Sequence, residues 1–293
     1  MPRSVLYCSD PLNPRRVDEH FADEAGRVRS LGGAVGLIDH DALLRGDTRG
    51  AVARVPAGLG PSWYRGWMIP SERYDALAHA LRDRDVELAV TPERYRAAHE
   101  LPGWYGAFER LTPASVWSPL RAEQDPDDET LASLAASLRP GSGIVKDYVK
   151  SRKHEWDEAC FIPDLSDATA VRRIVRRFVE LQGEFLAGGV VLREFEFFAT
   201  RESGPGEVRV WWLDGEARLL TPHPDSPEGK DCPAPDLGHV APAVRSLGCR
   251  FVTTDVALRS DGTWRVVEVG DGQVSDLHAA VDRGELVDLL LAG

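Results

Sequence analysis

The sequence predicts a mixed α/β fold, and three stretches carry this prediction. Near the N-terminus, two short apolar strands over 4–8 and 32–38 flank an amphipathic helix over 18–30. A longer, basic amphipathic helix over 168–182 is followed by several apolar strands. Close to the C-terminus, two β-branched-rich strands are joined by the turn Ser260-Asp261-Gly262-Thr263. Strands that alternate with helices indicate a parallel sheet, whereas strands joined by tight turns indicate antiparallel pairing.

The first half of the chain continues with elements that the same periodicities predict. An aromatic, strand-like stretch over 63–69 is followed by a helix that begins at Ser71. A buried strand over 86–90 then precedes a helix that opens at Pro92, since proline is favoured in the first turn of a helix. The segment 100–128 is rich in Pro, Trp and Tyr and fits neither a helical nor a strand period.

A change of character near Pro140 indicates a domain boundary. The helix expected over 128–138 ends at Arg139-Pro140-Gly141, which is a clear stop signal. We therefore expect an N-terminal α/β region over 1–140 and a second domain over 141–293. In the second domain we expect further helices over 237–247 and from about Arg283, and strands over 143–149, 189–198, 207–213 and 217–221.

The composition excludes several classes of protein. The 293 residues carry 47 acidic and 35 basic side chains, a formal net charge of -12, whereas a general nucleic-acid binder needs a basic surface. No stretch approaches the roughly eighteen apolar residues of a membrane helix, and the N-terminus lacks the apolar run of a signal peptide. The four cysteines include no Cys-x-x-Cys pair. We therefore expect a cytoplasmic protein with reduced thiols, no nucleic-acid partner and no membrane contact.

The most informative feature is a pair of acidic residues in the C-terminal hairpin. Asp255 lies near the start of the strand over 251–258, and Glu268 lies near the end of the strand over 264–272. An antiparallel hairpin brings these ends together, so that two carboxylates on one face repel each other. A divalent cation relieves that repulsion, and Mg²⁺ favours carboxylate and phosphate oxygens. The alternative is that the two residues are unrelated and lie on a solvated hairpin.

Basic residues gather just after the expected boundary. Lys146 lies inside an apolar strand, where an unpaired ammonium would be costly to bury. The loop Lys150-Ser151-Arg152-Lys153-His154 follows directly, and a loop of this composition can hold phosphate oxygens as a flexible lid. The alternatives are a solvent-exposed lysine on an edge strand and an ordinary charged loop.

Two further places combine charge with strand character. Glu207 and Arg209 are two residues apart and share one face of a strand, where they form either a cross-strand ion pair or a carboxylate for ribose or metal beside a cation for phosphate or an oxyanion. Arg65 offers a bidentate fork to a substrate carboxylate. Its alternative is a structural arginine stacked between Trp63 and Trp67.

Taken together, residues 143–277 resemble the ATP-grasp superfamily. The order of features is the same: a strand lysine, a basic loop, an apolar strand ending in Glu194 and Phe195, a strand with an acidic residue, and the acidic hairpin. The carboxylate–amine ligases of this superfamily carry Asp, twelve residues, Glu, one residue and Asn. Asp255 and Glu268 have this spacing, whereas Gly270 stands at the Asn position and Asp271 follows it. A cation two residues before the Asp is usual there, and this chain has Thr253.

The resemblance implies a fold and a set of roles. The fold would be an ATP-grasp fold, in which a small N-terminal α/β domain precedes two α+β lobes that sandwich the nucleotide. The Tyr64-Arg65-Gly66-Trp67-Met68 stretch looks more specifically like a poorly characterised actinobacterial and phage branch. The implied ATP contacts are Lys146, Lys150 and Ser151 at the phosphates, Glu194 and Phe195 at the adenine edge, and Glu207 at the ribose. The implied Mg²⁺ ligands are Asp255, Glu268 and Asp271, and the catalytic candidates are Arg209, Lys153 and Arg65.

The activity implied by this resemblance is ligation. ATP-grasp enzymes typically form an acylphosphate from a carboxylate and ATP, which an amine then attacks, so we expect an ADP-forming ligase for a small molecule or peptide. Two alternatives stay open: an ATP-grasp kinase that phosphorylates a hydroxyl, and a nucleotide-binding protein without catalysis, which Gly270 favours. Many members of the superfamily are dimers, so a homodimer is a further expectation.

Overall fold

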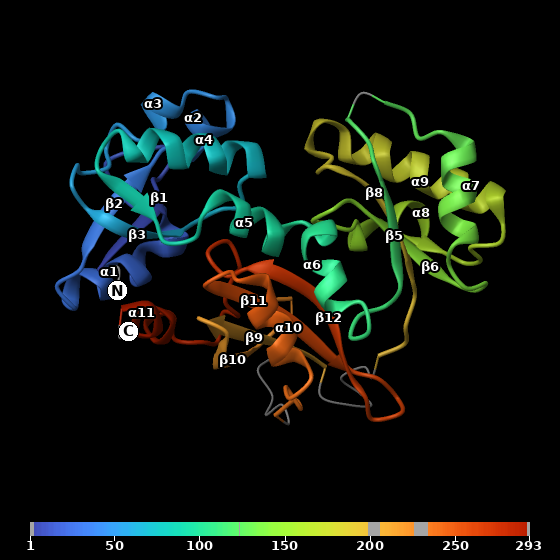
Figure 1. The fold of residues 1–293 in the computed structure, drawn as a ribbon. Helices are drawn as coiled ribbons and strands as arrows, with labels where there is room; N and C mark the ends of the chain where they lie inside the picture. The colour runs from blue at the N-terminus through green and yellow to red at the C-terminus, as the bar shows by residue number, and fades with distance from the viewer. Residues whose placement is uncertain (1–2, 123, 199–205, 226–233, 292–293) are drawn as a thin grey trace.

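The computed structural model describes residues 3–122, 124–198, 206–225 and 234–291. These residues form three four-stranded sheets. One sheet belongs to an N-terminal domain, one to a lobe at the opposite end of the molecule, and the third lies between them (Figure 1). The mixed α/β fold predicted from the sequence is therefore confirmed.

The N-terminal domain is built on a parallel sheet with the strand order β2-β1-β3-β4. Its strands are β1 (Ser4–Cys8), β2 (Ala34–Ile38), β3 (Gly60–Arg65) and β4 (Val86–Leu88). Its helices are η1 (Glu19–Phe21), α1 (Ala22–Ser30), α2 (His40–Leu44), α3 (Thr48–Ala51) and α4 (Ser71–Arg82). The expected strand–helix–strand start is present, because β1 pairs in parallel with β2 across α1.

The lobe at the other end has an antiparallel sheet with the order β5-β8-β6-β7. Its strands are β5 (Ser115–Pro119), β6 (Gly143–Lys146), β7 (Phe161–Ile162) and β8 (Gly189–Glu194). Its helices are α7 (Asp128–Ala136), η2 (Lys153–Glu155), α8 (Trp156–Ala159), α9 (Ala168–Gln182) and η3 (Gly183–Phe185). Because β5 pairs with β8, the chain passes the expected boundary at Pro140 within this lobe.

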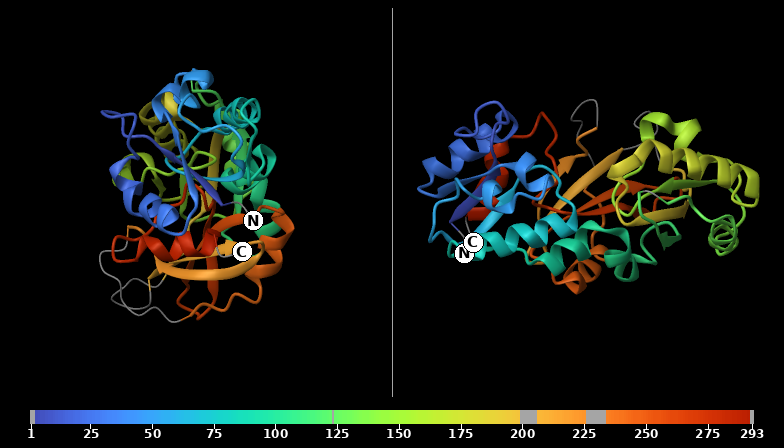
Figure 2. Two further views of the ribbon diagram at one scale, coloured as in Figure 1. Left: turned by 90° about the vertical axis from the view of Figure 1, so that its left-hand side faces the viewer. Right: turned by 90° about the horizontal axis from the view of Figure 1, so that it is seen from above.

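The third sheet is antiparallel with the order β10-β9-β11-β12. Its strands are β9 (Glu207–Leu213), β10 (Glu216–Pro222), β11 (Phe251–Leu258) and β12 (Trp264–Asp271). The helices α5 (Pro92–His99) and α6 (Leu101–Phe108) contact β12 and are joined by α10 (Val240–Leu247). Helix α11 (Arg283–Leu291) leaves this sheet and packs against α1, so the last described residues lie under the N-terminal domain (Figure 2).

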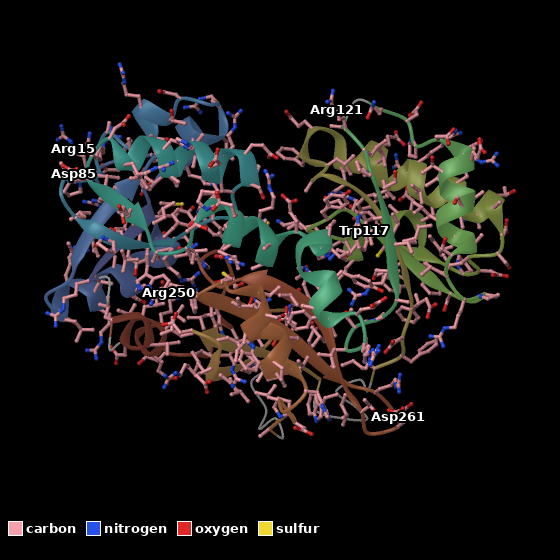
Figure 3. The ribbon with its side chains drawn as sticks, viewed as in Figure 1. Arg15, Asp85, Trp117, Arg121, Arg250 and Asp261 are labelled. Carbon is pink, nitrogen blue, oxygen red and sulfur yellow. The ribbon has the colours of Figure 1, made fainter. Side chains whose placement is uncertain are left out.

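Two separate hydrophobic cores divide the molecule differently from the three sheets. One core runs without a break from the N-terminal domain into the third sheet. Arg250 lies at this junction (Figure 3), with its guanidinium 5.0 Å from the ring centre of Trp63. The lobe that carries β6 has its own core beneath α9, whose residues Val171, Ile174 and Phe178 are buried at helical spacing. The lobe with Lys146 is therefore packed independently of the sheet that it faces.

Among the described residues, no helix combines the length and the apolar character needed to cross a bilayer.

Candidate active site

The hairpin brings its two acidic residues together as the sequence predicts. Asp255 of β11 and Glu268 of β12 are direct partners in the antiparallel register, so both side chains lie on one face of the third sheet. Glu268 also reaches the lobe at the other end, because its Oε1 accepts a hydrogen bond from the Lys146 ammonium at 3.3 Å. This contact joins β12 to β6 and closes a site between the two sheets.

Strand β9 adds two more charged groups to the same face. Arg209 is paired with Asp255 in the register, and Glu207 is paired with Ala257. The Arg209 guanidinium donates to both Asp255 oxygens, at 2.7 and 2.8 Å, and its Nη1 donates to the Asp276 carbonyl at 2.9 Å. The cross-strand ion pair considered from the sequence therefore exists, although it is buried rather than on an exposed face.

The electrostatics of this face show carboxylates in competition. Burial and the nearby Asp255 carboxylate raise the pKa of Glu207 to about 7. Glu268 shows the opposite balance: burial raises its pKa, but Lys146, Lys153 and Arg209 outweigh this effect and hold the pKa at about 2. Lys153 is stabilised as a cation, because the attraction of Glu207 and Glu268 exceeds the effect of burial and raises its pKa.

His223 joins this face, although the sequence suggests only weakly that this loop residue lies near the nucleotide. Its Nε2 lies 3.6 Å from an Asp255 oxygen, and its Nδ1 accepts a hydrogen bond from the Asp225 N–H at 3.2 Å. Single ligand atoms of Glu207, His223 and Asp255 all lie within 4.8 Å of one another. Burial lowers the pKa of His223. The sequence signal that could have found it is the Pro-His-Pro stretch next to a strand end.

A second residue missed by the sequence reasoning is Arg193. It is fully buried on β8, and its Nη1 donates to the Val267 carbonyl of β12 at 2.7 Å. Burial lowers the pKa of this guanidinium to about 10. Arg193 thus forms a second link between the two sheets beside the Lys146–Glu268 contact.

The basic loop follows β6 as predicted and is fixed at its middle. Ser151 forms a backbone bridge with Lys146. Arg152 donates to the Leu181 carbonyl at 3.2 Å and to Gln182 at 3.0 Å, which ties the loop to the end of α9. The flanking Lys150 and Lys153 are exposed, so their ammonium groups are free to meet an anionic ligand.

Asp271, expected as a third metal ligand, lies elsewhere. It is three residues after Glu268 on the same strand, so its side chain points to the opposite face of the sheet. There it is fully buried and accepts hydrogen bonds from the backbone and side-chain amides of Gln273, at 2.9 and 3.1 Å. Burial raises its pKa to about 7. The expectation that Asp271 replaces the missing Asn does not hold in this structure.

The two residues expected at the adenine edge are also engaged. Glu194 is on the face of β8 opposite to that of Lys146, because Lys146 is paired with Val191 in the register. Its carboxylate accepts hydrogen bonds from the Arg139 backbone N–H and from the Arg139 guanidinium. Phe195 lies in an aromatic cluster with Trp156, Phe161 and Phe197. The Glu194 side chain is therefore turned away from the carboxylate site.

Arg65, expected to recognise a substrate carboxylate, is structural. It is 1% exposed and forms a bidentate ion pair with Glu24, at 3.0 and 3.1 Å. Its Nη1 donates to the carbonyls of Gln273 and Ser275. The flanking rings are not those of Trp63 and Trp67 but those of Phe21 and Trp211, at 5.6 and 5.8 Å. No substrate can reach this guanidinium.

The donor set suits a divalent cation and a polyanionic ligand. Glu207, Asp255 and Glu268 offer hard oxygen donors on one face, and the raised pKa of Glu207 records their repulsion. Mg²⁺ prefers such donors together with phosphate oxygens. Lys146, Lys150 and Lys153 border the same space from the other sheet and its loop. The residues present therefore fit Mg²⁺ with a nucleotide.

The fold is similar to those of several proteins of known structure. D-cycloserine synthetase DcsG aligns with a TM-score of 0.61 at 15% identity, over 97% of this chain and 98% of that one. A RimK domain protein ATP-grasp from Sphaerobacter thermophilus gives 0.59 at 14% identity, over 99% and 100%. The ATP-grasp ligase PsnB, complexed with minimal precursor, Mg and ADP, gives 0.57 at 15% identity, over 100% and 98%. At these identities the likeness establishes the fold.

The sequence comparison gives the family. No curated protein is significantly similar to the chain. The model of an ATP-grasp domain, family 3 of its clade, matches residues 134–290, which is more than half of the 293 residues. The matched region contains the carboxylates, the lysines and the loop described above. The chain therefore belongs to this family of ATP-grasp domains.

Proposed function

We propose that this chain is an ATP-dependent, ADP-forming ligase that joins the carboxylate of a peptide or small molecule to an amine through an acylphosphate. The observation that carries the proposal is the contact between Lys146 and Glu268. It places a buried cation from one sheet against a row of carboxylates on another, with further lysines beside them. This arrangement of charges is what a triphosphate and its metal ion require.

The residues of the chain divide the work by position. Lys146, with Lys150 and Lys153, binds and orients the phosphate groups. Mg²⁺, when held by Asp255, Glu268 and Glu207, would neutralise charge on the phosphates. Arg209 is a positioning residue, because its bidentate contact with Asp255 fixes that carboxylate in one orientation. Positioning of both reactants between the two sheets then supplies much of the acceleration.

The substrate class is suggested by the neighbours in structure. PsnB is an ATP-grasp ligase complexed with its precursor peptide, MdnC is a macrocyclase bound with its precursor peptide, and DcsG is a synthetase of a small molecule. These enzymes share the fold at 11–16% identity. Both peptides and small molecules are therefore candidate substrates, and each should be offered as carboxylate donor and as amine.

The test is the release of ADP and phosphate with panels of carboxylates and amines. An amide product identified by mass supports the ligase, whereas a phosphorylated hydroxyl compound would identify a kinase. Glu268→Gln removes a charge that faces Lys146 and should lower ADP release at least about 10²-fold. Glu216→Gln is the matched control, because this glutamate is on β10 of the same sheet and forms an exposed pair with Arg245. Full activity of Glu268→Gln would contradict the proposal.

A further inference from the structure

His223 is held in a defined place by its neighbours in sequence. Pro222 pairs with Val208 at the end of β10, and the His223 N–H donates to the Glu207 carbonyl at 3.2 Å. Because Pro224 follows, the backbone of His223 is restricted to extended conformations. His223 therefore continues β10 by one residue, and its side chain lies on the same face as Glu207 and Asp255.

The tautomer of the ring follows from its hydrogen bond. Nδ1 accepts the backbone N–H of Asp225 at 3.2 Å, so Nδ1 presents a lone pair and the proton of the neutral ring is on Nε2. This Nε2–H lies 3.6 Å from an Asp255 oxygen, beyond hydrogen-bond distance. The side chain is 9% exposed. Within the described part of the chain, Nε2 has no hydrogen-bond acceptor, so a buried donor points into the site without a partner.

The same tautomer argues against coordination of a metal by His223. A metal ligand needs a lone pair on the coordinating nitrogen, and here the lone pair belongs to Nδ1, which the Asp225 N–H occupies. The closeness of the ring to Glu207 and Asp255 is therefore that of a donor facing acceptors. Arg209 is already committed to Asp255 and to the Asp276 carbonyl, which leaves His223 as the uncommitted donor on this face.

We propose that His223 is a further catalytic residue, whose Nε2–H donates a hydrogen bond to an oxygen of the phosphoryl group as it leaves ATP. This inference rests on the proposed ligase function. In the step, the bond between the γ-phosphorus and the bridging oxygen breaks and ADP leaves with the electron pair. A new bond forms between that phosphorus and a carboxylate oxygen of the substrate. His223 transfers no proton, and its hydrogen bond strengthens as charge develops.

The test uses a probe that needs no knowledge of the substrate. ADP with Mg²⁺ and aluminium fluoride imitates a phosphoryl group in transfer, and its dissociation constant is compared with that of ADP and Mg²⁺ alone by calorimetry. His223→Leu should weaken the aluminium fluoride complex about 10²-fold and leave the binding of ADP nearly unchanged. His79→Leu is the control, because His79 is an exposed histidine on α4. His223→Gln keeps an N–H donor and should retain tighter binding of the complex than His223→Leu.

Two results would overturn the inference. Equal binding of the aluminium fluoride complex by His223→Leu and the unaltered chain would exclude the hydrogen bond. A loss of Mn²⁺ binding in His223→Gln, measured by electron paramagnetic resonance without nucleotide, would make His223 a metal ligand instead. If the unaltered chain binds neither ADP nor the complex, the proposed function fails as a whole. Should the leucine variant not fold, the glutamine variant still decides between donor and ligand.

Discussion

Two buried ion pairs of this protein have similar composition and opposite surroundings. In the N-terminal domain, Arg65 and Glu24 are 1% and 0% exposed, and the guanidinium makes four hydrogen bonds to protein atoms. Between the two facing sheets, Lys146 is 5% exposed, but Glu268 is 37% exposed and a single contact of 3.3 Å joins them. The first pair is saturated by the protein, whereas the second has capacity left for a ligand.

This difference separates a structural charge from a functional one. A buried charge is tolerated only where other groups compensate it. At Arg65 the compensation comes from Glu24, Gln273 and Ser275, which belong to distant parts of the chain. At Lys146 the compensation is incomplete, and the carboxylates it faces repel one another. Burial alone therefore does not identify a site, and the number of unused donors and acceptors does.

The strongest test of the comparison is Lys146→Met. The substitution removes the cation that faces Glu268, so ADP release should fall about 10³-fold. The midpoint of thermal unfolding should change little, because Lys153 and Arg209 still attract Glu268. Steady-state kinetics and a thermal melt measure the two effects. A variant that melts far below the unaltered chain would show that this pair, too, is structural.

Arg65→Met should show the reverse pattern. It leaves Glu24 buried without its bidentate partner, and breaking a buried pair in this way costs about 3–5 kcal/mol. Chemical denaturation measures the loss, and the double variant with Glu24→Leu should recover most of it. The Michaelis constant for ATP should be unchanged in the folded fraction. A selective rise in that constant, without destabilisation, would return Arg65 to the active site.

The buried Asp271 offers a test by pH. Burial raises its pKa from 3.8 to about 7, so the native state keeps a proton that the unfolded chain releases between pH 4 and 7. The free energy of unfolding should therefore fall as pH rises through this window, by up to about 4 kcal/mol, and level off above pH 7. Asp271→Asn should remove this dependence. Urea denaturation at several pH values compares the two proteins, and parallel curves would refute the assignment.

The smallest effect is expected at the surface. Arg27 and Asp288 join α1 to α11 through two hydrogen bonds of 2.7 and 2.8 Å, but both side chains are more than 40% exposed. Arg27→Ala should cost less than about 1 kcal/mol and lose its effect in high salt. Denaturation at two salt concentrations measures this. A larger, salt-independent loss would mean that geometry counts for more than exposure in such pairs.

The sequence predicted those elements whose stabilising pattern is local. Helix α9 occupies the predicted residues 168–182, because Asp167 caps it and the buried positions recur at helical spacing. The hairpin of β11 and β12 was found for the same reason. The segment 100–128 could not be assigned, since β5 is a strand only because it pairs with β8, about seventy residues away. Its aromatic residues carry no period of their own.

The candidate site shows the same division. Spacing along the chain was enough to pair Asp255 with Glu268, because a hairpin is a local structure. Spacing also suggested Asp271, which the alternation of side chains along β12 sends to the other face. His223 and Arg193 showed little signal, because each acts through a neighbour that is remote in the sequence or on another sheet.

The sequence by itself determined the class of fold, the acidic hairpin and the lysine with its basic loop, since each depends on residues close together in the chain. Only the tertiary structure decided which charges are available to a ligand. It turned Arg65 and Glu194 toward protein partners and brought Lys146 to Glu268 across two sheets. The physical reason is that a charge is neutralised by whatever folding places beside it, and those neighbours come from segments that no local pattern connects.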